Sequence, residues 1–196
     1  MNIQLGVDDF FAIAAPGLLI TGGLLVLIAQ LVLPRFRVEV AFWITVGTLS
    51  IGILGGLMPQ LWPASFIPMI LDGNVANLVS GTLVVRGFME QVLMSGYVYQ
   101  YTMLIMVAML AIVLIGRKVL RESNLNLVEV YMLYLFSGSG LMLFISAGDL
   151  MTLFLGLELS SLPMYVLAGF ARNDKRSNEA GLKYFLLSAF SSAFLL

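Results

Sequence analysis

Long apolar stretches recur along this chain, and each approaches the roughly 20 residues that a helix needs to cross a bilayer. They fall at about 10–33, 38–58, 97–116, 127–147, 150–170 and 177–196. Only 11% of the residues are charged, whereas soluble domains carry about a quarter. The chain therefore has too little polar surface for water, and the sequence predicts an all-α membrane protein with about six transmembrane helices.

The connection at about 59–96 differs from the other connections. It holds three prolines (Pro59, Pro63 and Pro68), then Asp72 and Gly73, then a β-like stretch that ends at Val85. Prolines and turn residues in this density interrupt a helical pattern. We expect an extramembrane loop here that contains a hairpin or an interfacial helix.

Cysteine and histidine are both absent from the chain. Their absence excludes haem, Fe–S clusters, thiolate or imidazole zinc sites and disulfides within these 196 residues. Only carboxylates, lysines and tyrosines are left to handle protons. The net charge of −1 gives no electrostatic reason to expect a nucleic-acid partner.

Basic residues gather in alternate connections. Eight of the ten Lys and Arg residues lie at 34–37, 117–126 and 171–176, namely Arg35, Arg37, Arg117, Lys118, Arg121, Arg172, Lys175 and Arg176. The opposite side holds only Arg86, and Lys183 falls within the last apolar stretch. By the positive-inside rule, the basic connections are cytoplasmic and the N-terminus lies outside.

One carboxylate, Glu158, sits in the middle of the stretch at 150–170. An ionised group at that depth costs about 2.5–3.5 kcal/mol, so the side chain is expected to face protein or water and to have a partner. Ser161 shares its helix face and is a candidate to donate a hydrogen bond or hold water. Glu158 is then either a proton-exchanging group, which we favour, or a protonated side chain that only joins helices.

The sequence leaves the roles of Lys183 and Glu129 more open than that of Glu158. Lys183 lies seven residues past Arg176, and Glu179 stands four residues before it in the favourable order for an ion pair. A salt bridge at the helix entrance and a joint role with Glu158 are both open. Glu129 begins the stretch at 127–147, where a carboxylate also suits the positive end of a helix dipole.

Two further features have structural interpretations. Asp149 stands between two apolar stretches and is expected to form a turn or to cap the helix that follows. The run Ser137-Gly138-Ser139-Gly140 is typical of a small-residue face for close helix packing, not of a phosphate loop.

Three blocks in the second half of the chain carry a family resemblance. They are Ala147–Leu159, Ser161–Phe170 and Arg176–Phe185, and the last of them (RSNEAGLKYF) is the most specific. From Glu129 to Leu196 the sequence resembles subunit N of the proton-translocating NADH:quinone oxidoreductase (respiratory complex I), a relative of Mrp-type cation/proton antiporter subunits. The first 125 residues match that family mainly in the layout of their helices.

The resemblance implies a fold and roles for three residues. Glu158 matches the family's essential glutamate, Lys183 its next buried lysine and Glu129 an acid on the preceding helix. The fold implied is an antiporter-like bundle of about 14 helices with inverted repeats. This chain would be its N-terminal part, with three leading helices in 1–126 and the truncated start of the first repeat in 127–196.

The resemblance also implies a function. The chain would be a membrane-arm subunit that moves protons by charge coupling of buried Glu and Lys, without an active site or cofactor of its own. NADH, FMN, Fe–S clusters and quinone would belong to the whole complex, and the partners would be other membrane-arm subunits and the lipid bilayer. The expected location is a bacterial inner (plasma) membrane, in preference to an organellar inner membrane. The alternatives are a subunit of an Mrp-type sodium/proton antiporter, of a related membrane-bound hydrogenase complex, or an inert scaffold.

The basic asymmetry gives a direct test of sidedness. Single cysteines at positions 121 and 72 should react with a membrane-impermeant maleimide from opposite sides, because an odd number of crossings separates them. Labelling from intact and from inverted vesicles distinguishes the two sides. Labelling of both positions from one side would contradict the predicted helix count.

Overall fold

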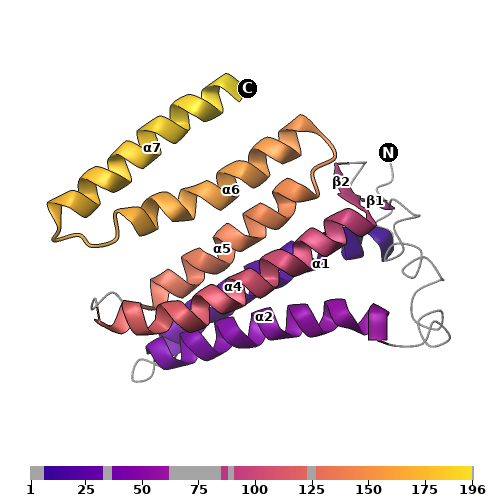
Figure 1. Ribbon diagram of the computed structural model, residues 1–196, viewed down its shortest axis with the longest axis horizontal. Coiled ribbons are helices and arrows are strands. Elements are labelled where there is room, and N and C mark those ends of the chain that lie inside the picture. Colours follow the sequence, from indigo (N-terminus) through magenta and orange to yellow (C-terminus); the bar gives the residue numbers. More distant parts are fainter. Residues whose placement is uncertain (1–6, 33–36, 62–84, 88–90, 123–126, 196) are drawn as a thin grey trace.

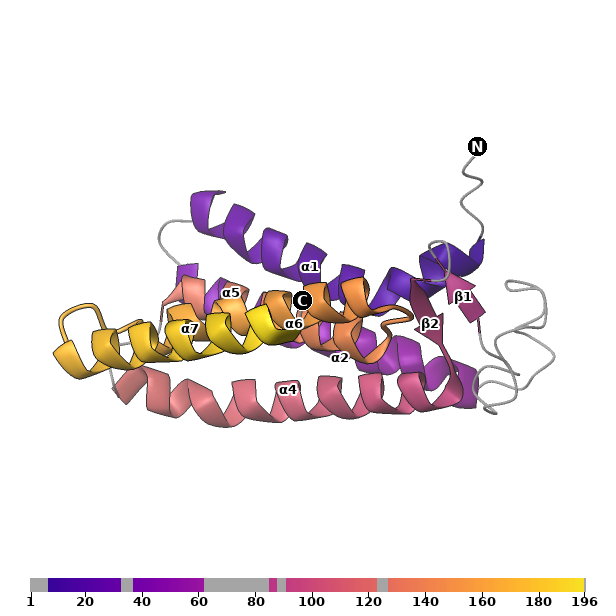
Figure 2. The same ribbon diagram turned by 90° about the horizontal axis from the view of Figure 1, so that it is seen from above.

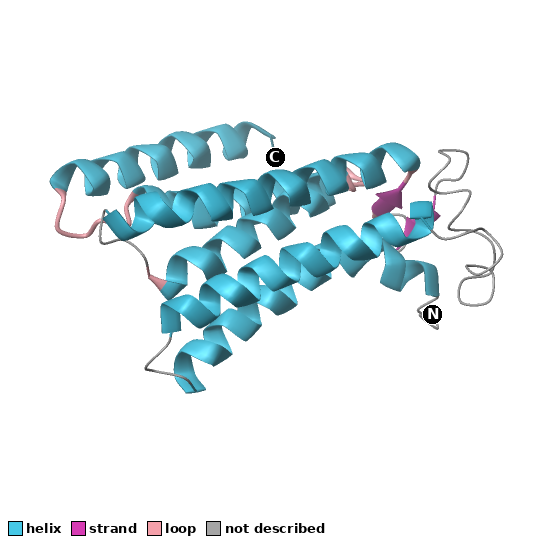
Figure 3. Ribbon diagram, turned by 60° about the horizontal axis from the view of Figure 1, so that its bottom comes forward, coloured by secondary structure: helices cyan, strands magenta, loops and turns pink. Residues whose placement is uncertain are grey.

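The computed structural model describes residues 7–32, 37–61, 85–87, 91–122 and 127–195, and nearly all of them are helical (Figure 3). The six helices of these residues are α1 Val7–Val32, α2 Arg37–Leu61, α4 Gly96–Glu122, α5 Val128–Ile145, α6 Leu150–Ala168 and α7 Lys175–Leu195. Two short strands, β1 Val85–Gly87 and β2 Val92–Met94, form an antiparallel pair. This architecture confirms the predicted all-α fold.

Successive helices run up and down beside one another, as Figures 1 and 2 show. Helix α5 is central because it packs against α1, α2, α4 and α6, whereas α7 lies at the edge and packs on α6. The core between α1, α2, α4 and α5 is apolar. Its most buried large side chains are Leu19, Leu49, Met106, Leu135 and Met142.

Five of the described helices are long and apolar enough to cross a membrane: α1, α2, α4, α5 and α6. Pro16 and Pro163 lie within α1 and α6, and both helices continue through them. Helix α7 matches the sixth predicted stretch, but its first half carries Lys175, Arg176, Glu179 and Lys183 and is therefore less apolar. The predicted helices are thus present, and the last differs from the others in polarity.

The up-and-down order places the helix ends that flank the predicted basic connections at one end of the bundle. Helices α1, α4 and α6 end there, and α2, α5 and α7 begin there, on the left of Figure 1. We call this the basic end. Among the described residues, it carries Arg37, Arg117, Lys118, Arg121, Arg172, Lys175 and Arg176.

Helices α5 and α6 are in backbone contact. A Cβ atom added at Gly140 would collide with the backbone of Leu159 and Ser160, and one added at Gly156 would lie 2.5 Å from the backbone nitrogen of Phe144. The Ser137 hydroxyl also donates to the Ser160 carbonyl, at 2.8 Å. The predicted small-residue face in 137–140 is confirmed as a surface for close helix packing.

The β-hairpin fastens onto the turn between α5 and α6, at the end opposite the basic end. The Leu93 backbone N–H donates to the Ser146 carbonyl at 2.7 Å, and that of Gly148 donates to the Gln91 carbonyl at 2.6 Å. This confirms the hairpin among the two alternatives expected for the connection at about 59–96, although residues 62–84 lie outside the described residues.

Asp149 caps the start of α6 within the same turn. Its carboxylate accepts the backbone N–H of Thr152 at 2.6 Å, which satisfies one of the free donors of the first helical turn. Hydrogen bonds from Thr152 hold the pKa of the Asp149 carboxyl below its ordinary value. The predicted capping role of Asp149 is confirmed.

The contact between α5 and α6 should not tolerate a single added methyl group. Gly140→Ala or Gly156→Ala is expected to lower stability by about 2 kcal/mol or more, because the new Cβ meets backbone that cannot move aside. The measurement is the thermal unfolding midpoint in detergent. Gly116→Ala on α4 is the matched control, since open space surrounds its Cβ position; equal midpoints in all three variants would contradict the packing described.

Candidate functional site

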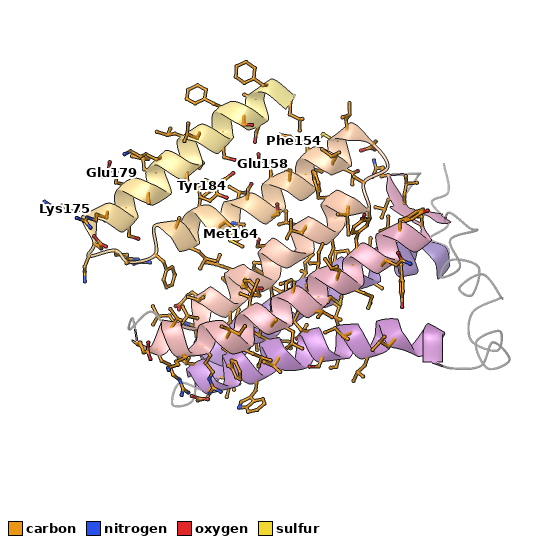
Figure 4. All side chains as sticks on the ribbon, in the orientation of Figure 1. Phe154, Glu158, Met164, Lys175, Glu179 and Tyr184 are labelled. Atoms are coloured by element: carbon orange, nitrogen blue, oxygen red, sulfur yellow. The ribbon has the colours of Figure 1, made fainter. Side chains whose placement is uncertain are left out.

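The predicted central carboxylate, Glu158, lies halfway along α6 and points toward α7 (Figure 4). The Ser192 hydroxyl of α7 donates a hydrogen bond to its Oε1 atom. Glu158 is half-buried, and Ser192 is buried with 8% of its surface exposed. The expectation that this carboxylate faces protein and has a partner is confirmed.

The partner was missed in the sequence. Ser161 was the candidate, but its hydroxyl donates to the Glu158 backbone carbonyl at 3.3 Å and not to the carboxylate. The signal for Ser192 is that it stands one turn after Ser188, in a stretch whose other residues are apolar except for Ser191. That spacing places both hydroxyls on one face of α7.

Lys183 lies against Glu179 and not against Glu158. Its Nζ atom is 2.5 Å from Glu179 Oε1, and 68% and 63% of the two side chains are exposed. Lys183 stands nine residues before Ser192 on α7, which is about 13 Å of helical rise. The salt bridge, which the sequence left open as one of two interpretations, is therefore the contact this structure contains.

Glu129 also lies apart from Glu158. It is half-buried in the first turn of α5, at the basic end, and its Oε1 accepts from Gln30 Nε2 of α1 at 3.1 Å. Gly140, which contacts α6 beside Glu158, stands eleven residues further along α5, or about 16 Å away by helical rise. The three predicted site residues thus occupy three separate places.

The block Arg176–Phe185 docks α7 onto the end of α6. The Ser177 hydroxyl donates to the Ala168 carbonyl at 2.8 Å. Gly181 packs on the backbone of Gly169. The rings of Tyr184 and Phe185 meet Tyr165 edge to face, with centroids 4.8 and 5.9 Å away. These residues face α6, so Glu179 and Lys183 are left on the outer side of α7.

A second ion cluster, at the basic end, was not anticipated from the sequence. Glu39 of α2 pairs with both Arg117 and Arg121 of α4. The Arg117 guanidinium also lies 3.9 Å above the centre of the Phe42 ring. The cluster fastens α2 to α4, and a cation over an aromatic face adds to that attachment.

No group of three or more Asp, Glu, His or Cys side chains within the described part of the chain could hold a metal ion. The chemistry available between α6 and α7 is that of one carboxylate and several hydroxyls, which can exchange protons.

Together, five helices long and apolar enough to cross a membrane and a backbone-packed helix pair define a multi-pass membrane protein, with a half-buried glutamate in mid-span. Residues 147–196 match the membrane domain described as NADH:quinone oxidoreductase/Mrp antiporter. The matched segment contains α6 and α7, and with them Glu158, Ser192 and Lys183.

Relatives of the chain agree with that family. The chain is similar to NADH-quinone oxidoreductase subunit N of Methylobacterium nodulans, with 36% identity over 183 residues, which are 93% of this chain and 34% of the relative. Its identity to subunit N of Trichlorobacter lovleyi is 41% over 127 residues, or 65% of this chain and 26% of that protein. Subunit N of Rhizorhabdus wittichii is 59% identical over 68 residues, 35% of this chain and 14% of the relative.

These similarities confirm the resemblance that the sequence motifs predicted, to subunit N of complex I. The chain spans about a third of the length of the Methylobacterium relative and about a quarter of the Trichlorobacter relative.

Proposed function

We propose that this chain is a membrane-arm subunit of a proton-translocating NADH:quinone oxidoreductase and that Glu158 is the group that carries its protons. One observation supports the proposal above all: a carboxylate in the middle of a membrane-spanning helix, half-buried, with a hydroxyl as its hydrogen-bond partner. A carboxylate in such a position has a high energetic cost, so carboxylates within membrane helices ordinarily have a function. The relatives are named as subunits of NADH-quinone oxidoreductase, and this indicates the complex in which the chain would act.

In this proposal the chain has no redox step of its own. The NADH, FMN, Fe–S clusters and quinone belong to partner subunits, and the protein responds to their chemistry through the charges in its membrane helices. Protonation of Glu158 is coupled to the nearness of a lysine, because an adjacent cation stabilises the carboxylate and its departure favours the acid. The partners are other membrane-arm subunits, and residues 127–196 begin the first antiporter-like repeat.

The location proposed is a bacterial inner membrane. The basic end faces the cytoplasm and the N-terminus lies outside, because cationic connections are retained on the cytoplasmic side. The gathering of seven described basic residues at one end of the bundle supports this orientation.

The second candidate is a subunit of an Mrp-type sodium/proton antiporter. The matched family includes Mrp antiporters in its description, and this alternative would use the same glutamate. A related membrane-bound hydrogenase complex is a further alternative of the same kind. Genes for the other complex I subunits beside this one would favour the first proposal, and Mrp genes the second.

Lys183 is expected to matter, though less than Glu158. Lys183 and Glu179 form an exposed ion pair, and charges on membrane helices ordinarily face other protein and serve a function. We therefore expect the assembled complex to need the charge of Lys183. In the full-length protein, Lys183→Arg should retain most NADH-driven proton uptake, because Arg keeps the pair with Glu179. Lys183→Ala should be clearly lower. Wild-type uptake in both variants would reduce Lys183 to a structural salt bridge.

Glu158 should be the residue on which proton translocation depends. Glu158→Gln keeps the size and hydrogen bonding of the side chain but cannot bind and release a proton at neutral pH. We therefore expect an assembled complex with proton uptake lowered about tenfold or more. Glu158→Asp retains the charge with a shorter reach and should be partly active.

The measurement is NADH-driven proton uptake into inverted membrane vesicles, after assembly has been verified on native gels. Glu129→Gln, at another of the predicted site residues, shows whether the loss is specific to Glu158, because Glu129 bonds to Gln30 at 3.1 Å and lies outside the contact between α6 and α7. Wild-type uptake by a fully assembled Glu158→Gln complex would show that the glutamate only joins helices.

A further inference from the structure

The surfaces of α6 and α7 that face each other carry a row of hydroxyl groups. The Tyr165 hydroxyl of α6 donates to Ser188 of α7, and the Ser192 hydroxyl of α7 donates to Glu158 of α6. Tyr165 and Ser192 are buried, with 7% and 8% of their surfaces exposed, and Ser188 is half-buried. Every polar side chain of this row therefore lies between the two helices.

The row has a direction along the bundle. Tyr165 lies three residues, or about 5 Å of helical rise, before the last residue of α6, which ends at the basic end, and its partner Ser188 lies thirteen residues, or about 20 Å of rise, from the start of α7. Ser188 and Ser192 are four residues apart on α7, so about 6 Å separates their backbones. That is close to the span of one water molecule with two hydrogen bonds of about 2.8 Å each. Glu158 then stands at the far end of the row.

We propose that the hydroxyls of Tyr165, Ser188 and Ser192 form a proton path between α6 and α7, by which Glu158 is loaded from the basic end. The inference rests on the proposed function of Glu158 and adds the route and the side from which its protons come.

Hydroxyl groups suit such a path because each both donates and accepts. Ser192 passes its proton to the Glu158 carboxylate and takes another from the bridging water. That water takes one from Ser188, Ser188 from Tyr165, and Tyr165 from water at the basic end. Each O–H bond broken is matched by one formed, and no group in the row changes its charge except Glu158.

The charged residues nearby do not interrupt the row. Lys183 and Glu179 pair with each other on the outer side of α7. Tyr184 contributes its ring, which packs against Tyr165, and its side chain is 47% exposed. Tyr184→Phe is therefore a matched control, because it removes a tyrosine hydroxyl beside the row and not within it.

The alternative is that the hydroxyls only hold α7 to α6, as polar side chains commonly do between membrane helices. The two interpretations predict different proton uptake for substitutions that remove a hydroxyl group and for those that keep it, with little change in packing. Tyr165→Phe and Ser188→Ala remove it, and Ser188→Thr keeps it with one methyl group more.

The first experiment measures protons taken up per NADH oxidised, in vesicles with the full-length protein in its assembled complex. We expect Tyr165→Phe and Ser188→Ala to lower this ratio about twofold or more, and Ser188→Thr and Tyr184→Phe to keep it. Wild-type ratios in Tyr165→Phe and Ser188→Ala, with Glu158→Gln inactive, would overturn the path and leave the proposed function standing. A wild-type ratio in Glu158→Gln would overturn the proposed function itself.

The second experiment tests the side of loading. Dicyclohexylcarbodiimide modifies protonated carboxyl groups, and mass spectrometry of the peptide with Glu158 measures its rate of modification. In vesicles of known orientation, acidifying the basic side should speed the modification, and Tyr165→Phe should remove most of that response. A rate that follows the pH of the opposite side, in wild type and variant alike, would overturn the proposal.

Discussion

The backbone contact between α5 and α6 sets the orientation of α6, and with it the direction in which Glu158 points toward α7. Gly156 and Ser160 of α6 both lie against α5: Gly140 of α5 leaves room for the Ser160 backbone, and Gly156 itself leaves room for the backbone of Phe144. Glu158 is two residues from each of them, which is about 200° around a helix. The sequence Gly-x-Glu-x-Ser therefore turns the carboxylate away from α5 and toward α7. A side chain at either glycine would separate the helices and release that constraint.

The docking of α7 gives the most specific sequence block a structural meaning. Within Arg176–Phe185, the serine, the glycine and the two aromatic residues face α6, and each fills a different part of the contact. The same helical turns leave Glu179 and Lys183 on the other side, paired four residues apart. One short segment thus positions α7 for the Glu158–Ser192 hydrogen bond and also presents an ion pair outward. Similarity in this block therefore reflects packing as well as charge.

The sequence predicted features that depend on local spacing. The helices, the Asp149 cap, the small-residue face at 137–140 and the pair of Glu179 with Lys183 all follow from residues within a few positions of one another. The features that could not be predicted join distant segments: Ser192 to Glu158, and Glu39 to Arg117 and Arg121. Each of these depends on how far one helix has slid and rotated against another. Backbone contacts at glycines fix that register, and no periodicity within a single helix reveals it.

A hydroxyl partner suits a proton-exchanging carboxylate better than a cation in direct contact would. A lysine paired with Glu158 would stabilise only the ionised form and oppose its protonation. The Ser192 hydroxyl donates to the carboxylate and, after rotation about its C–O bond, accepts from the carboxylic acid. Glu158 therefore keeps a hydrogen bond in both states while it stays half-buried between the helices. Lys183 pairs with Glu179 and stands about 13 Å of helical rise before Ser192, the hydrogen-bond partner of Glu158, so its charge acts on Glu158 only at long range. In the proposed function, gain or loss of a proton at Glu158 would therefore not break the contact that holds α7 in place.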